Sequence, residues 1–302
     1  MALSPEIRVP LAVATLAALL AGPGCIEIVG ADLGKYVERE QKQFSTTGKP
    51  EVLLSTFDGS IEVRPWDKDE VQVIIEKRAI NKESAATIEV HADQTGNRIT
   101  VDVRTEKVKG FHISFNNSKS AKLIVSLPAS SELVAKTGDG SIDVERVTGH
   151  VEMRTGDGSI RARQLGGDVS AHSGDGSIKI DGVNGALNVD TGDGSIAVTG
   201  KLTSVHARSG DGSVTIHAEA GSAPSSDWDI TTGDGSVTLE LPADFGAELD
   251  ARAGDGSIRL QDVTLSNVTG PTGKNSVRGR LGQGGRAVRV RTGDGSITLR
   301  RP

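Results

Sequence analysis

The stretch Gly138-Asp139-Gly140-Ser141-Ile142 decides the fold, because the chain of 302 residues repeats it. Gly-Asp-Gly-Ser occurs eight times between residues 138 and 296, and Ile or Val follows every copy. A fixed period of this length is typical of proteins built from stacked repeats. The evenness of the duplication favours a scaffold role over an active site. The first five aspartates lie 18 residues apart: Asp139, Asp157, Asp175, Asp193 and Asp211.

Each 18-residue unit is expected to form two short strands joined by two turns. In the first unit, Ile142 and Val144 are apolar in one arm, and Val151 and Met153 in the other. Apolar residues two apart are the period of a strand with one buried face. The pattern therefore predicts an all-β fold, a β-solenoid: a single-stranded β-helix of 18-residue coils with two strands each.

The motif itself is expected to form one of the two turns. Its aspartate is expected to accept a hydrogen bond from the backbone N–H of the serine two residues on. Such a bond contributes about 1.5–3 kcal/mol, against about 1 kcal/mol of repulsion between stacked carboxylates in water. The flanking glycines are expected to supply a positive φ. These turn glycines are Gly138, Gly140, Gly156, Gly158, Gly174, Gly176, Gly192, Gly194, Gly210 and Gly212.

Cation binding is the alternative role considered for the aspartates. Stacked carboxylates could hold calcium, although the motif lacks the ligand spacing of an EF-hand loop and of calcium β-rolls. No other cofactor and no catalytic residue is predicted, since nothing pairs a nucleophile with a base. The candidate metal ligands are Asp139, Asp157, Asp175, Asp193 and Asp211.

The N-terminus predicts export and a lipid anchor. Residues 1–24 are interpreted as a signal peptide, with Arg8 ahead of an apolar stretch over residues 9–21. Cys25, the one cysteine of the chain, follows directly, like the lipid-acceptor cysteine of bacterial lipoproteins. Gly22 and Pro23 depart from the usual pattern before that cysteine, so an ordinary cleaved signal and an uncleaved anchor stay open. We expect a membrane-anchored lipoprotein of the bacterial cell envelope, facing the periplasm or the surface.

The rest of the chain divides into three regions. Residues 25–48 are expected to form a polar tether with a short helix over residues 33–43. Residues 49–130 are expected to form an N-terminal β cap region, with Phe57, Trp66 and Phe115 in its core, which covers one end of the stack. Residues 131–302 are the β-solenoid repeat region, and residues 272–277 are interpreted as a worn copy of the motif.

Two stretches carry a resemblance to a known family. Residues 121–128 (AKLIVSLP) and residues 133–142 (LVAKTGDGSI) are similar to the bacterial putative-adhesin family of β-strand repeats, a domain of unknown function. Residues 58–63 with residues 69–73 match its opening strands, and the resemblance covers residues 49–302. It implies an envelope-associated β-solenoid without established catalytic residues.

Three classes of function are compared. The first is a non-enzymatic envelope or surface scaffold, adhesin-like, that binds a protein or polysaccharide partner. The second is a polysaccharide-active β-helix enzyme, which the even spread of acids and the scarcity of aromatics disfavour. The third class is an ice- or mineral-binding array on one column of hydroxyls: Thr137, Thr155, Ser173, Thr191 and Ser209.

The charge of the chain also bears on its partners. A net charge of −6 with mixed signs disfavours nucleic acid as a partner.

Overall fold

The fold is one large β-sheet curled around a single core. The computed structural model describes residues 26–32, 35–105, 119–269 and 273–301, so the predicted signal peptide, Cys25 and Phe115 lie outside the described residues. In that part of the chain, 23 strands join one sheet, and the short helix α1 (Lys82–Ala86) lies at one end. The prediction of an all-β fold is therefore confirmed. None of the described helical residues forms a span long and apolar enough to cross a bilayer.

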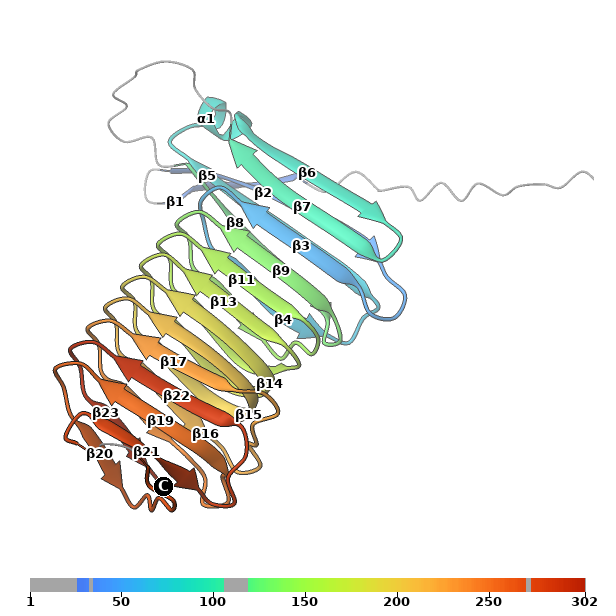
Figure 1. The fold of residues 1–302 in the computed structure, drawn as a ribbon. Coiled ribbons are helices and arrows are strands. Elements are labelled where there is room, and N and C mark those ends of the chain that lie inside the picture. The colour runs from blue at the N-terminus through green and yellow to red at the C-terminus, as the bar shows by residue number, and fades with distance from the viewer. Residues whose placement is uncertain (1–25, 33–34, 106–118, 270–272, 302) are drawn as a thin grey trace, which may run out of the picture.

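Two walls of strands, joined by corners, enclose the core (Figure 1). The strands of the front wall face the viewer in Figure 1, and each lies parallel to the next. In stack order the front wall contains β7 (Arg98–Thr105), β3 (Glu51–Thr56), β9 (Glu132–Thr137), β11 (Val151–Thr155), β13 (Val169–Ser173), the second halves of β14 (Ile178–Thr191) and β15 (Ile196–Ser209), β17 (Trp228–Thr232), β22 (Ala287–Thr292) and β19 (Ala247–Ala253).

The back wall repeats this arrangement behind the core. In stack order it contains β8 (Ser120–Pro128), β4 (Ile61–Trp66), β10 (Ile142–Glu145), β12 (Ile160–Gly166), the first halves of β14 and β15, β16 (Val214–Ala218), β18 (Val237–Glu240), β23 (Ile297–Arg300) and β20 (Ile258–Gln261).

The 18-residue period appears directly in the register of both walls. Ile142 pairs with Ile160, and Ile160 pairs with Ile178 on the back wall. Val151 pairs with Val169 on the front wall. All five side chains are buried, so equivalent apolar residues stack in columns that fill the space between the walls. The alternation read from the sequence is therefore correct.

The order of the coils differs from chain order at both ends of the stack. The coil of β3 and β4 lies between the β7–β8 coil and the β9–β10 coil, both of which follow it in the sequence. The coil of β22 and β23, the last in the chain, lies between β17–β18 and β19–β20. The expectation that each coil pairs with the next one along the chain therefore holds only in the middle. The sheet also runs without a break across residue 130.

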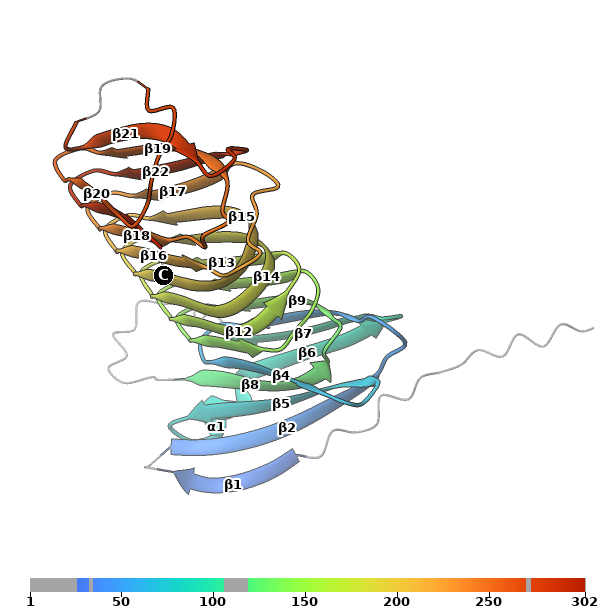
Figure 2. The ribbon, with the colours of Figure 1, turned by 90° about the horizontal axis from the view of Figure 1, so that it is seen from below.

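Antiparallel strands close the N-terminal end. β5 (Glu70–Ala79), β2 (Lys35–Ser45) and β1 (Ile26–Asp32) extend the back wall beyond β8, as Figure 2 shows, and β6 (Ile88–Thr95) extends the front wall beyond β7. The predicted helix in a tether is wrong for residues 35–45, which form β2. Val37 and Phe44 of β2 are buried, and the Lys77 ammonium lies 3.4 Å from the Glu38 carboxylate, so a polar-looking segment is stable in the sheet.

The C-terminal end differs from the predicted worn repeat. Residues 276–281 form β21 (Ser276–Leu281), which pairs antiparallel with β19 and so does not build a coil. The aromatic core also lies in this half: Trp228 and Phe245 are almost wholly buried, with ring centroids 5.1 Å apart. Phe57 and Trp66, expected in the N-terminal core, are only partly buried.

Candidate functional site: the aspartate rim

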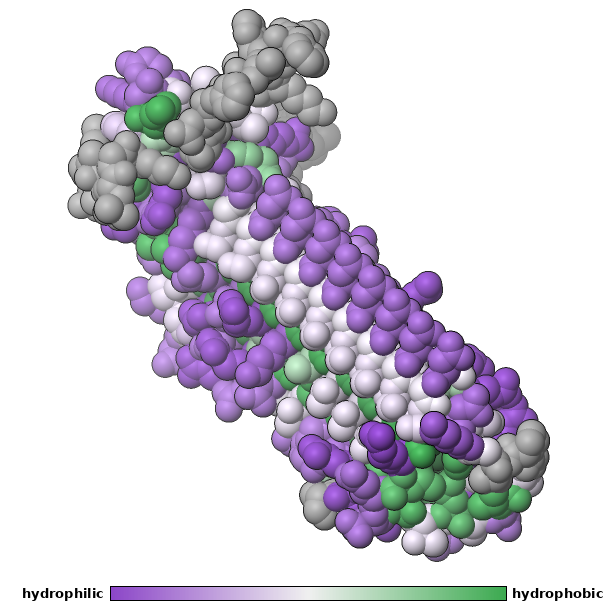
Figure 3. Space-filling view, turned by 90° about the vertical axis from the view of Figure 1, so that its left-hand side faces the viewer, coloured by the Kyte–Doolittle hydropathy of each residue, from purple (hydrophilic) through white to green (hydrophobic). Residues whose placement is uncertain are grey.

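The eight Gly-Asp-Gly-Ser corners align along one rim of the stack. Gly156 N–H donates to Gly138 O at 2.5 Å, and Gly192 N–H donates to Gly174 O at 2.5 Å, so each corner lies directly on its neighbour. The aspartates of all eight corners are exposed. Figure 3 faces this rim, and a continuous hydrophilic row follows it beside paler rows.

Close packing of the backbone explains the glycines. A Cβ placed on Gly156 would lie 2.8 Å from Gly138 O, and one on Gly158 would lie closer still to Gly140 O. Real Cβ atoms do not come so near to backbone oxygens, so only glycine fits. The expected positive φ is wrong for the ten motif glycines between residues 138 and 212, since none lies in the left-handed region. The glycines serve contact between coils, not a left-handed turn.

A column of buried hydroxyls holds successive corners together. The Thr155 hydroxyl donates to Gly140 O of the neighbouring coil at 2.8 Å and accepts from its own corner's Gly158 N–H at 3.3 Å. Ser173 repeats both contacts with Gly158 O and Gly176 N–H. The ice- or mineral-binding interpretation is therefore wrong, because its hydroxyls face inward. Buried members of the column are Thr137, Thr155, Ser173, Thr191 and Ser209.

The aspartate carboxylates do not make the hydrogen bond expected of them. Within the described residues, no donor contacts the carboxylates of Asp139, Asp157, Asp175, Asp193 or Asp211, and the hydroxyl column satisfies the corner instead. In the same residues, no three His, Cys, Asp or Glu side chains come together as a metal-ligand set. Calcium binding by these five aspartates stays a prediction, which calorimetric titration tests.

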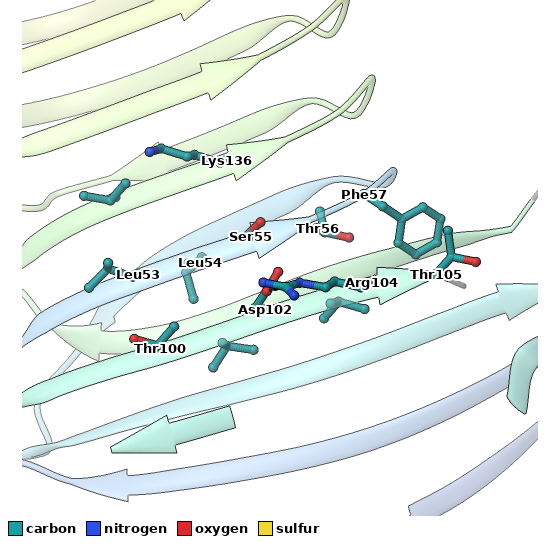
Figure 4. Close-up of a pocket in the computed structure, with 13 residues that line it drawn as sticks. Leu53, Leu54, Ser55, Thr56, Phe57, Thr100, Asp102, Arg104, Thr105 and Lys136 are labelled. Atoms are coloured by element: carbon teal, nitrogen blue, oxygen red, sulfur yellow. Dashed lines mark ion pairs between the residues drawn. The ribbon is translucent and has the colours of Figure 1, made fainter. Parts of the chain in front are cut away.

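Within the described residues, one hollow lies on the outside of the front wall. It has a volume of about 540 Å³ and is bounded by β3, β7 and β9 (Figure 4). Leu53 and Val134 are among its apolar lining residues, and Phe57 lies at one side of it in Figure 4. Of its two cations, Arg104 pairs with Asp102, whereas Lys136 lies 3.5 Å from Glu152, a carboxylate that also pairs with Arg154 at 2.8 Å. Three cations therefore share two carboxylates at this hollow.

Residues 50–300 match the family described as Toastrack DUF4097. The matched range includes every corner of the rim. The chain belongs to this family. The resemblance to a β-repeat domain of unknown function is confirmed, since Toastrack DUF4097 is such a domain. No curated protein matches this Toastrack chain.

Solved structures similar to this Toastrack domain include three from Bacteroides and Parabacteroides species. A "putative adhesin" from Bacteroides fragilis is 12% identical, with a TM-score of 0.45 over 87% of this chain and 97% of that one. A "putative lipid binding protein" from Parabacteroides distasonis is 13% identical, with a TM-score of 0.42 over 86% and 96% of the two chains. A "putative adhesin" from the same species has the same identity and coverage and a TM-score of 0.41.

Ion pairs cover the outer walls of the Toastrack stack between neighbouring coils. Arg163 pairs with Glu145, and His172 Nδ1 lies 3.0 Å from Asp190. Exposed pairs of this kind contribute about 0.2–1 kcal/mol each, so they fix register more than stability.

Two carboxylates are tuned by their neighbours across the Toastrack sheet. Burial of Glu240 would raise its pKa, but His217 at 3.1 Å and Arg300 at 2.8 Å together hold that pKa below its usual value. Burial of Glu76 is likewise outweighed by Arg78 and Arg39, which lower the pKa of Glu76. Each cluster joins adjacent strands through one carboxylate paired with basic side chains, which is the arrangement of a structural ladder.

Proposed function

We propose that this Toastrack chain is a non-enzymatic scaffold of the bacterial cell envelope, a β-solenoid rod whose walls bind a protein or polysaccharide partner. One observation carries the proposal: the residues that recur most regularly serve contact between coils. The hydroxyl of Thr155 and the backbone of Gly156 and Gly158 all contact the neighbouring corner. A catalytic centre would instead need one corner to differ from the rest in its acids and bases.

Export and anchoring complete the proposal. The apolar stretch over residues 9–21 and Cys25 support a lipid-modified N-terminus at the β1 end of the sheet. A rod anchored at one end would hold its far end, with β20 and β21, away from the membrane.

Mass spectrometry of the mature N-terminus tests the anchor. We expect a chain that begins at Cys25 and carries diacylglycerol, and a Cys25→Ser variant that leaves the membrane fraction for the soluble one. An unmodified mature chain in the soluble fraction would overturn anchoring while leaving the scaffold role open.

An activity screen tests the scaffold role. The purified chain is incubated with uronate-containing and neutral polysaccharides, and we expect no release of reducing ends. Turnover abolished by one Asp→Asn substitution on the rim, and retained by the same substitution at another corner, would show an enzyme instead.

A further inference from the structure

The back wall ends one strand short of the front wall at the C-terminal end. On the front wall, β19 pairs with β22 on one side and with β21 on the other. On the back wall, β20 pairs with β23, and no described strand lies on its other side. The sheet therefore has an open edge at β20.

Backbone groups point out from this edge. In a parallel ladder alternate residues direct their N–H and C=O groups to the same neighbour. Gln261 O accepts from Arg301 N–H on the β23 side at 3.2 Å, so Ile258 and Leu260 direct theirs to the open side. Ile258 N–H donates to Lys274 O at 2.8 Å, so a loop residue already occupies the start of this edge. The N–H and C=O of Leu260 have no partner among the described residues.

The side chains of β20 are also incompletely covered. Leu260 lies in register with Leu299, yet Leu260 is 37% exposed and Leu299 is fully buried. Val268, in the segment that follows β20, is 50% exposed. Figure 3 shows apolar surface gathered at this end of the stack. An incompletely covered strand edge is a template for pairing with another strand, so this edge fits a partner strand.

Basic residues border the same edge. Residues 258–302 hold nine Lys and Arg against two Asp, in a chain of net charge −6. Arg278, Arg280, Arg289 and Arg300 pair with acids. Arg259, Lys274 and Arg301 have no ion pair within the described residues. Two such ends would repel each other, which disfavours a symmetric contact between copies of this chain.

We propose that β20 is a docking edge for an extended segment of a partner protein that alternates apolar and acidic residues. Its backbone pairs with the N–H and C=O of Leu260, its apolar face covers the Leu260 side chain, and its carboxylates lie beside Arg259 on the outer face. A lipid surface does not fit, because it would leave the backbone groups of Leu260 unpaired. The inference gives the proposed scaffold a partner-binding end, but its test uses the purified chain and is independent of anchoring.

The test uses a capped synthetic peptide of about six alternating Val and Glu residues as the probe. Binding is followed by NMR of the ¹⁵N-labelled chain, with an alternating Val and Lys peptide as the control probe. We expect the Val-Glu peptide alone to shift the amides of residues 258–262 and to slow hydrogen exchange at Leu260. An Arg259→Glu variant should bind it about three- to tenfold more weakly, in line with reversal of one exposed charge.

The matched control is Arg291→Glu, which makes the same charge change at an exposed position on the front wall. Arg291→Glu should bind the Val-Glu peptide within about twofold of the wild type. Equal loss in both variants, equal binding of the two peptides, or a Leu260 amide already protected without peptide would overturn the docking edge. So would concentration-dependent dimers abolished by Arg259→Glu, since the occupant would then be a second copy.

Discussion

At the scale of single residues, each corner depends on the absence of a side chain at its glycines. The second glycine has no Cβ because the backbone of the neighbouring corner occupies that space, and the aspartate points to solvent without a donor. The residue that holds the corner is the hydroxyl one position before the motif. Stability at the rim should therefore depend on the glycine and the hydroxyl and not on the carboxylate.

Substitutions within one corner separate these contributions. Gly176→Ala should lower the free energy of unfolding by about 2–3 kcal/mol, because its Cβ would collide with the backbone of Gly158. Asp175→Asn, the neighbouring exposed position, should change it by less than about 0.5 kcal/mol. Urea denaturation of both variants measures the difference. A larger loss for Asp175→Asn than for Gly176→Ala would show that the carboxylate is structural.

The hydroxyl column gives a second prediction at this scale. Thr155→Val keeps the shape but leaves Gly140 O and Gly158 N–H without the Thr155 hydroxyl, at a cost of about 1–3 kcal/mol. Thr155→Ser is the matched control, since serine fills the same position in other coils, for example at Ser173 and Ser209. Thermal unfolding should rank the wild type and Thr155→Ser well above Thr155→Val. Equal melting temperatures for all three would refute the role of the column.

At the scale of strands, the alternation of apolar residues predicted the two walls, and the polar composition of residues 35–45 concealed β2. That strand is stable because its charged side chains meet partners on β5, a relation between distant segments that no local pattern contains. The corner hydroxyls were visible in the sequence as a Thr or Ser before every motif but one, where Ala253 stands. Their inward direction follows from strand alternation, since Thr155 lies two residues after the buried Met153.

Glu76 on β5 predicts a pH dependence. Arg78 and Arg39 lower the pKa of Glu76 in the folded protein, so the folded state binds fewer protons than the unfolded state as the pH falls through the normal carboxyl range near 4.5. The stability from this cluster is therefore present above that range and lost as the pH falls below it. Glu76→Gln should destabilise the protein by about 1 kcal/mol at pH 7.

The comparison that checks this is urea denaturation of both proteins between about pH 7 and 3. The difference between the wild type and Glu76→Gln should shrink on acidification. Glu219→Gln, at an exposed position without an ion pair in the described chain, is the control and should follow the wild type. A Glu76→Gln difference that stays constant with pH would rule out this linkage.

At the scale of the whole molecule, the stacking order of the coils could not be predicted from the sequence. The motifs at Asp234, Asp255 and Asp294 have the same pattern, so nothing local shows that the last of them lies between the other two. Pattern specifies which side of a strand faces the core but not which coil becomes its neighbour. The open edge at β20 follows from that order and was missed for the same reason.

Hydrogen exchange should reveal the order directly. Strands β22 and β23 lie next to the C-terminus in sequence but between two coils in space, so their amides should be protected as well as those of β12 and β13. Amides of β20, at the open edge, should exchange faster than those of β23. Fast exchange throughout residues 287–300 would contradict the interleaved order.

The position of the β22–β23 coil between two earlier coils also determines the order in which the sheet can form. Residues 287–300 are the final part of the sheet to leave the ribosome or an export channel, yet their neighbours on both sides are made earlier. The coil of β19 and β20 cannot join the sheet beside β17 and β18 until β22 and β23 have formed between them. The C-terminal half of the sheet can therefore close only after residues 287–300 have been delivered.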